Sequence, residues 1–234
     1  MTGSSSRADA LLREYRREVL RWNNQVSLVS RKDPEKTFDR LMVQCREGLG
    51  VLLAADPVGL IGAPDIRYFD LGSGGGLPGV VWHVMMVQRG VAPRTTLVEP
   101  REKRAWFLDR LRGLEGMPDY AVLQTRWGAE RTSPAPGPGA VTLISLKALR
   151  LTDREILEGL AEPEAGVRLV IARYYPPGEA FTPDLAKELE ISRETTSEGV
   201  EVAGVGVSWV PTGASILPGM DFSLLISAYK AASF

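Results

Sequence analysis

A glycine-rich run, Asp70-Leu-Gly-Ser-Gly-Gly-Gly-Leu-Pro-Gly79, constrains this chain more than any other feature of its sequence. The short apolar segment 66–71 before the run is typical of a strand, and segment 78–88 after it is typical of a helix. Glycines in such a strand-to-helix turn let the backbone approach a ligand closely. The run therefore predicts a nucleotide-type pocket where the strand ends.

A carboxylate follows the run at a spacing that suits a ribose ligand. Segment 95–99 is typical of a second strand and ends in Glu99, about 25 residues after the glycines, close to where dinucleotide folds place an acidic ribose ligand. The alternative is a tight turn and a solvated strand end. Because both features occur together, we expect Glu99 to accept hydrogen bonds from the ribose hydroxyls.

Strands and helices alternate through the middle of the chain. This order predicts an α/β, Rossmann-like fold with a doubly wound, mostly parallel sheet. Segments 200–210 and 222–229 are expected to form a terminal antiparallel pair, joined by a loop that contains proline and glycine. The other expected strands are 120–125, 140–145 and 167–172, and the other expected helices are 102–114 and 152–160.

Two helices are expected before the sheet. Apolar residues recur every three to four positions over 11–26, and a second helix is expected over 34–53, with Asp33 as its N-cap and Pro34 at its first position. We therefore expect an N-terminal helical cap, residues 1–60, on a Rossmann-like cofactor-binding domain, residues 61–234, in one compact unit.

The amino-acid composition limits which classes of function the chain can have. Twenty-eight basic and 29 acidic residues give a net charge of -1, so a polyanion would have to be held by a local patch. There is no apolar stretch of membrane-spanning length and no secretory leader, which favours a cytoplasmic location. One cysteine, Cys45, and one histidine, His83, are too few for a metal cluster, and both are expected to be structural.

Several short motifs point to one family. The Leu-Pro-Gly ending of the glycine run is the most distinctive, and the others are Trp22-Asn23 with Leu28, Glu99 followed by Lys103-Arg104, Ala129-Glu130, and Ser145-Leu-Lys-Ala148. With these motifs, most of the chain resembles the bacterial small-subunit ribosomal RNA guanine-N7 methyltransferases, the RsmG or GidB family. The resemblance implies a class I methyltransferase fold with S-adenosylmethionine as the methyl donor.

The resemblance also implies roles for particular residues. Lys147 takes the place of a family arginine near cofactor and substrate, and Arg173 takes the place of a basic residue after a late strand, so these two are the catalytic candidates. The expected substrate contacts are Arg126, Trp127 and Tyr174, whereas Trp82, Trp106 and Phe107 are expected in the core. The expected cofactor contacts are Asp70, Gly72, Gly74, Gly76, Leu77, Glu99, Ala129 and Glu130.

The chain departs from the family pattern on the substrate side, at Leu41, Gln44, Gly128, Lys147 and Phe222. Two functions therefore stay open. The first is methylation of guanine N7, which needs no general base, with ribosomal RNA or the small ribosomal subunit as partner. The second is modification of a small molecule in specialised, natural-product biosynthesis, including a repurposed scaffold that works with a protein partner and no longer transfers methyl. Neither function involves a membrane.

Overall fold

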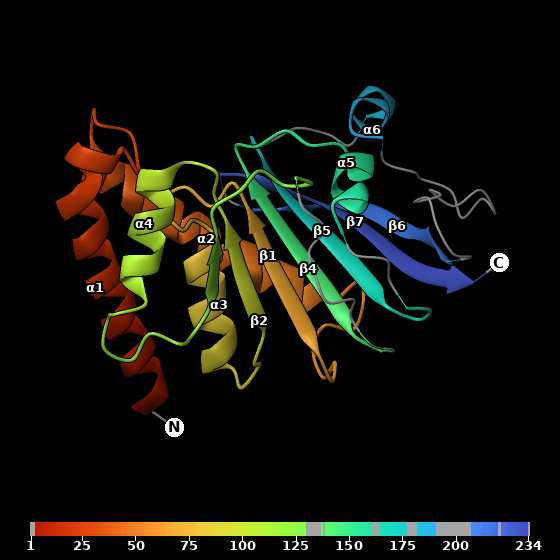
Figure 1. Cartoon of the computed structure of the whole chain (residues 1–234), viewed down its shortest axis with the longest axis horizontal. Helices are drawn as coiled ribbons and strands as arrows, with labels where there is room; N and C mark the ends of the chain where they lie inside the picture. The colour runs from red at the N-terminus through yellow and green to blue at the C-terminus, as the bar shows by residue number, and fades with distance from the viewer. Residues whose placement is uncertain are drawn as a thin grey trace.

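The computed structural model describes residues 3–129, 137, 139–160, 164–176, 182–190, 207–219 and 221–233, which form one sheet with helices on both faces (Figure 1). The strands follow the spatial order β3-β2-β1-β4-β5-β7-β6. The strands are β1 (Ile66–Leu71), β2 (Arg94–Val98), β3 (Ala121–Leu123), β4 (Val141–Lys147), β5 (Arg168–Tyr175), β6 (Val207–Pro218) and β7 (Ser223–Ser233). The helices are α1 (Gly3–Val26), α2 (Pro34–Ala55), α3 (Gly79–Gln88), α4 (Glu102–Leu111), α5 (Asp153–Glu158) and α6 (Pro183–Glu188).

The sheet has the expected doubly wound, mostly parallel topology. Strands β1 to β5 pair in parallel, and β7 pairs antiparallel with both β5 and β6. The chain moves outward from β1 through β2 to β3 and then returns to place β4 on the other side of β1. Ligands bind at such a reversal point, outside the carboxyl ends of the strands.

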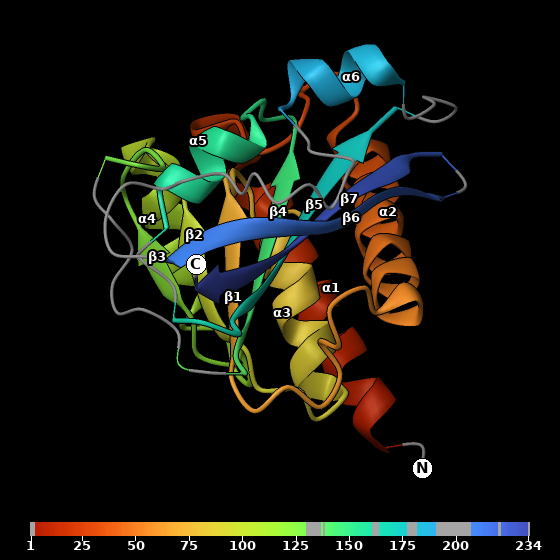
Figure 2. The same ribbon diagram turned by 90° about the vertical axis from the view of Figure 1, so that its right-hand side faces the viewer.

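Alternating side chains give the sheet two buried faces, and helices lie on both sides of the sheet (Figure 2). Tyr68 of β1 packs with apolar residues of α1, α2, α3 and α4, whereas its neighbours Phe69 and Leu71 pack with α5 on the opposite face. Burial on both faces explains why the parallel strands read as near-continuous apolar runs.

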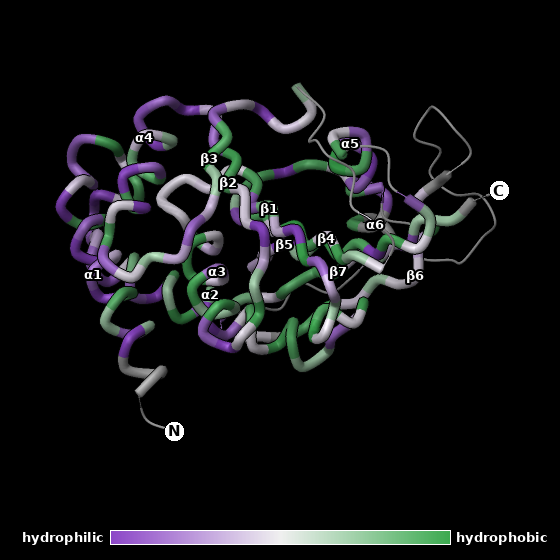
Figure 3. Tube along the Cα trace, turned by 60° about the horizontal axis from the view of Figure 1, so that its bottom comes forward, coloured by the Kyte–Doolittle hydropathy of each residue, from purple (hydrophilic) through white to green (hydrophobic). Residues whose placement is uncertain are grey.

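The N-terminal helices contact the glycine run directly. The Tyr15 hydroxyl of α1 donates to the carbonyl oxygen of Gly75 at 2.7 Å, and a Cβ on Gly75 would lie 3.3 Å from the Leu28 side chain. Asn23 holds this turn, since its Oδ1 accepts from the backbone N–H groups of Leu28 and Val29, both at 2.8 Å. The hydrophilic residues of α1 lie along the outside of the molecule in Figure 3. The expected helical cap is therefore packed against the ligand-binding loop.

Helix α2 begins as expected. The Asp33 carboxylate accepts from the Lys36 backbone N–H, and Pro34 occupies the first turn, where its missing N–H costs no hydrogen bond. None of the helices in the described ranges is long and apolar enough to cross a membrane.

The C-terminal region differs from expectation in detail. Strand β6 continues through Pro211 to Pro218, where a loop was expected, and α6 was not anticipated. Because β6 is the last strand of the sheet, Pro211 lies on an edge strand, where proline is tolerated, and a register shift follows between Pro211 and Gly213. Most of the expected strand 200–210 and most of the proline-rich segment 132–139 lie outside the described residues.

Candidate active site

A cavity of about 610 Å³ opens at the carboxyl ends of the central strands. This volume lies within the range of small-molecule and cofactor sites. The wall combines one carboxylate, three arginines, one tryptophan and several apolar side chains. The lining residues are Gly72, Val98, Glu99, Pro100, Arg101, Arg104, Thr125, Arg126, Trp127, Ala148, Leu149 and Leu151.

Gly72 forms the part of the wall where the glycine run begins. Its φ of +70° lies in the left-handed region that favours glycine. A Cβ there would lie 3.2 Å from the Leu149 side chain, so the absence of a side chain keeps this corner of the cavity open. Ala148 also has a positive φ, 58°, and this turn brings Leu149 back over Gly72.

Glu99 is fixed by backbone donors on both of its oxygens. Its Oε2 accepts from the Gly74 N–H at 2.8 Å, and its Oε1 accepts from the Arg101 N–H at 2.9 Å. The residue is 3% exposed and lines the cavity. Each carboxylate oxygen has a further lone pair, so Glu99 is positioned to accept from ligand hydroxyls without moving.

Asp70 is buried and is not among the residues that line the cavity, so its expected cofactor contact stays a prediction. Its carboxylate accepts from the Ser145 hydroxyl at 2.5 Å and from the Gly79 N–H at 3.1 Å. Burial raises the pKa of Asp70 to about 6, against the opposing effect of these hydrogen bonds. Asp70 therefore anchors the start of α3 to the sheet.

The other glycines of the run also support the loop and do not line the cavity. A Cβ on Gly76 would meet Val80 at 2.6 Å, and Leu77 packs with the core on the α1 side of the sheet. The N–H of Gly74 is taken by Glu99. The expected direct contacts of Gly74, Gly76 and Leu77 stay predictions, and what the structure shows for these residues is packing and loop geometry.

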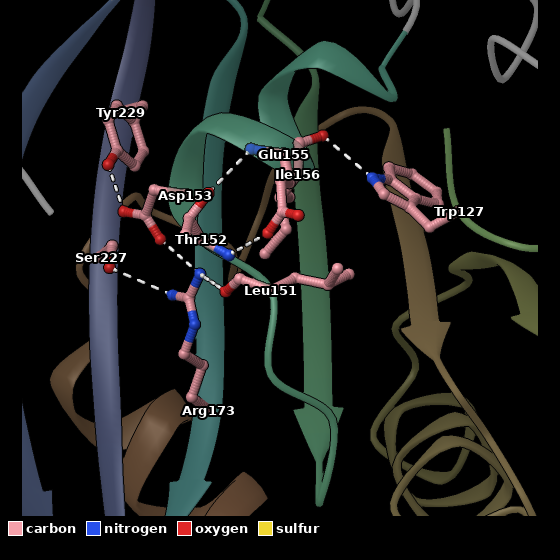
Figure 4. Close-up of polar contacts among 9 residues, drawn as sticks. All are labelled: Trp127, Leu151, Thr152, Asp153, Glu155, Ile156, Arg173, Ser227 and Tyr229. Atoms are coloured by element: carbon pink, nitrogen blue, oxygen red, sulfur yellow. Dashed lines mark hydrogen bonds and ion pairs between the residues drawn. The ribbon is translucent and has the colours of Figure 1, made fainter. Parts of the chain in front are cut away.

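The segment after β3 supplies two predicted residues to the cavity. Trp127 and Arg126 both line it, and the Trp127 Nε1–H donates to the Ile156 carbonyl oxygen at 3.1 Å (Figure 4). The Trp127 ring also packs edge-on against Phe69, with centroids 5.6 Å apart. Trp127 therefore shares a wall with Glu99. Ala129 is exposed and lies outside this wall, and Glu130 lies outside the described residues.

Arg173 is placed away from Lys147, contrary to the expected catalytic pair. It points to the α5 face, is 3% exposed and forms an ion pair with the buried Asp153 (Figure 4). Its guanidinium also donates to the Leu151 carbonyl oxygen at 3.2 Å and to the Ser227 hydroxyl at 3.4 Å. Register explains the error: Lys147 pairs with Tyr174, so Arg173, one residue earlier, faces the other side.

Lys147 lies at the carboxyl end of β4, on the face covered by α2. Its Nζ donates to Gln44 Oε1 at 2.7 Å and lies 4.3 Å from the centroid of the Tyr174 ring. Burial lowers the pKa of Lys147. Lys147 does not line the cavity, but it directly precedes Ala148, which does.

Tyr174 is packed and does not present a free face for a substrate base, which corrects its expected role. Its ring contacts Phe222 and Trp82, with centroids 5.2 and 6.1 Å away, and its hydroxyl donates to the Gln44 carbonyl oxygen. A Cβ on Gly48 would lie 2.2 Å from the same hydroxyl oxygen. Tyr174 therefore forms a wall behind Lys147.

Comparison with known families bears on the identity of this cavity. A family model named GidB, rRNA small subunit methyltransferase G, matches residues 8–152, from α1 to the turn before α5. This range contains every residue that lines the cavity. The chain belongs to the GidB family.

Curated relatives agree with the GidB assignment. The ribosomal RNA small subunit methyltransferase G of Bordetella pertussis is 29% identical over 168 residues, which cover 72% of this chain and 69% of the relative. The protein of the same name from Nitratidesulfovibrio vulgaris strain DP4 is 35% identical over 124 residues, covering 53% and 52%. The GidB-family chain is a methyltransferase, and S-adenosylmethionine is the methyl donor that the family resemblance implies.

A solved structure shares the fold. The crystal structure of MtNAS in complex with MTA and tNA aligns with a TM-score of 0.50 and 13% identity, covering 94% of the GidB-family chain and 70% of MtNAS. The expected Rossmann-like class I methyltransferase fold is confirmed. The cavity fits the cofactor, since Glu99 offers ribose acceptors, Gly72 leaves room beside the strand, and Trp127 provides an aromatic wall.

Some residues of the cavity wall were not among the expected cofactor contacts. Arg101 and Leu149 line the cavity and were not candidates, and Arg104 appeared only as part of a family motif. Because Arg101 directly follows Glu99-Pro100, its position in the sequence could have identified it as a residue of the cavity wall. Leu149 has no such signal, because it reaches Gly72 only through the left-handed conformation of Ala148.

Proposed function

We propose that this chain transfers the methyl group of S-adenosylmethionine to N7 of a guanine in small-subunit ribosomal RNA, in the cytoplasm. The observation that carries the proposal is the family match over residues 8–152, which includes the helical cap and the complete cavity wall. Guanine N7 attacks through a ring lone pair and has no proton to lose. The protein therefore has to hold acceptor and methyl group in line, and no general base is required.

The donor would be held by the residues that already converge on the cavity. Glu99 would accept from the ribose hydroxyls, the backbone at Gly72 would approach the donor closely, and Trp127 would pack against its flat face. S-adenosylmethionine supplies an electrophilic methyl group when bound. His83 takes no part, because it is 1% exposed and hydrogen-bonded to Thr95 on the α3 side.

The mouth of the cavity favours an anionic acceptor. Arg101, Arg104 and Arg126 line it together, although the whole chain has a net charge of -1. Burial lowers the pKa of Arg104, and its Nη2 donates to the Ser27 carbonyl oxygen at 2.8 Å. Local positive charge raises the concentration of a polyanion at the site.

The decisive experiment is methyl transfer from labelled S-adenosylmethionine to small ribosomal subunits from a strain that lacks the N7 mark. We expect label in 7-methylguanine of the subunit RNA, and much less with a Glu99→Gln variant at a cofactor concentration near the wild-type Kd. A folded protein that binds the cofactor but labels neither subunits nor their naked RNA would contradict the proposal.

One observation favours a second candidate, methylation of a small molecule. Three positions that depart from the family pattern lie in one cluster around Tyr174: Gln44 binds Lys147, and Phe222 packs on the Tyr174 ring. Such clustered changes would reshape the acceptor side while leaving the donor side intact. Labelled small-molecule product in an extract, with unlabelled subunits, would establish this alternative.

A further inference from the structure

Trp106 is exposed, although its place in an apolar helix pattern suggested the core. Its residue is 47% exposed on α4, and it is the only aromatic member among the exposed large hydrophobic residues of the described ranges. Its ring meets Trp22 of α1 edge-on, with centroids 4.9 Å apart. Two tryptophans from different helices thus meet at the surface of the cap.

Two arginines frame these rings. The Arg110 guanidinium carbon lies 5.2 Å from the Trp22 centroid and 6.0 Å from the Trp106 centroid, and Arg21 lies 5.9 Å from Trp22. Both arginine side chains remain accessible, 43% for Arg110 and 66% for Arg21. We call these four residues, Trp22, Trp106, Arg21 and Arg110, the tryptophan–arginine platform.

A single buried acid holds the platform together. Glu18 is 9% exposed, accepts from the Trp22 Nε1–H at 3.1 Å, and pairs with Arg21 and Arg110 at 3.4 Å each. The guanidinium groups are therefore pre-oriented over the rings. Because one carboxylate serves two arginines, the platform keeps a net positive charge.

The platform and the cavity both include residues of the α4 region. Arg101 and Arg104 line the cavity at the start of α4, and Arg110 lies nine residues beyond Arg101, about 13 Å along the helix. Lys103 is exposed and lies three residues before Trp106, on the same side of α4. The α4 region thus carries basic residues both at the cavity and beside the exposed ring.

From this arrangement we infer that the platform binds a single-stranded segment of the RNA substrate, with a base stacked on Trp106 and flanking phosphates on Arg110 and Arg21. The inference rests on the proposed function and identifies the surface that would bind the RNA substrate. Exposed aromatic rings between arginines suit unpaired bases, because every base has a face that can stack. An acidic protein surface could pair with the arginines but would leave the ring unused.

The test is the affinity of the full-length protein for a fluorescent single-stranded RNA 12-mer, with the duplex of the same sequence for comparison. We expect the single strand to bind more tightly than the duplex. Trp106→Ala should weaken single-strand binding about 5- to 150-fold, whereas Trp106→Phe should retain most of it. Arg110→Gln should also lower the dependence of log affinity on log salt by about 0.7.

Arg154→Gln is the matched control, because Arg154 pairs with Glu158 on the exposed surface of α5, away from the platform. Cofactor affinity by calorimetry should be unchanged in every variant. Equal RNA affinity of the wild type and Trp106→Ala, equal affinity for single strand and duplex, or no RNA binding by the wild type would each overturn the inference. Methylation of ribosomal subunits is scored separately, so a protein that binds RNA through Trp106 without methylating it would contradict only the proposed function.

Discussion

Glu99 is held by the backbone N–H groups of Gly74 and Arg101, so its orientation does not depend on a bound ligand. Glu99→Gln keeps the shape but removes the charge and one acceptor. We expect S-adenosylmethionine binding to weaken by about 1.5 to 3 kcal/mol, the value of a charge-assisted hydrogen bond, which calorimetry would measure. Glu102→Gln, three residues further and exposed, is the control. Unchanged affinity of the Glu99 variant would mean that the ribose binds elsewhere.

Lys147 remains the candidate for a direct role on the acceptor side. Its amine is half-buried and held by Gln44, next to a residue of the cavity wall. We expect Lys147→Ala to lower kcat by more than tenfold while cofactor affinity changes little, with Lys147→Arg partly active. Steady-state kinetics and calorimetry together check this, and a variant that loses cofactor affinity but keeps kcat would assign Lys147 to the donor.

Asp70 gives the fold a specific pH dependence. Its pKa is about 6 in the folded chain and near 3.8 when unfolded, so the folded state binds the proton more tightly. The free energy of unfolding should therefore fall by about 3 kcal/mol as pH rises from about 4 to above 6. Urea unfolding of the wild type and of Asp70→Asn across this window measures the contribution. A constant difference between the two proteins would show that Asp70 does not titrate there.

At the scale of elements, α5 is joined to the sheet by a buried ion pair between Asp153 and Arg173. Removing one partner leaves an uncompensated charge, so we expect Arg173→Met and Asp153→Asn each to lower the free energy of unfolding by about 3 to 5 kcal/mol. The double variant should lose less than the sum of the two. Urea unfolding of all four proteins completes the cycle, and strictly additive losses would argue against a coupled pair.

The fold could be predicted from element order because the central parallel strands β1, β4 and β5 are buried on both faces and are bounded by turn residues. Register could not be predicted, and that is why Arg173 was wrongly grouped with Lys147: neighbours in one strand point to opposite faces. Trp106 was misplaced for a similar reason. It stands between the buried residues Ala105 and Phe107 in the sequence of α4, but its own side chain is exposed. Trp82 and Phe107 are buried as predicted.

Within the site, the sequence of the glycine run also left part of the structure unpredicted. Its composition predicted a close backbone approach to a ligand, and Gly72 does line the cavity, but composition did not separate glycines that line the cavity from those that pack against the cap, such as Gly76. That distinction depends on Tyr15 and Leu28, which come from a distant part of the chain. A local sequence pattern does not reveal which distant residues will pack against it.

For the whole molecule, the cap and the sheet share one apolar core on the α1 side. We therefore expect the most protected amides of α1 and β1 to exchange with the same free energy of opening. S-adenosylmethionine at 100 times its Kd should raise both by about 2.7 kcal/mol. Hydrogen exchange followed by mass spectrometry measures this. Ligand protection confined to β1 would show that the cap opens independently.

The contact between Tyr15 and Gly75 has a consequence for synthesis on the ribosome. The two residues are 60 positions apart, and Glu18 reaches Arg110 across 92. Helix α1 is translated before the glycine run and α4, so these partners reach it only after the intervening residues have been made. Until then, α1 has partners in α2, where Tyr15 meets Phe38 and Arg16 pairs with Asp39, but it completes its packing only when the glycine run and α4 have been made.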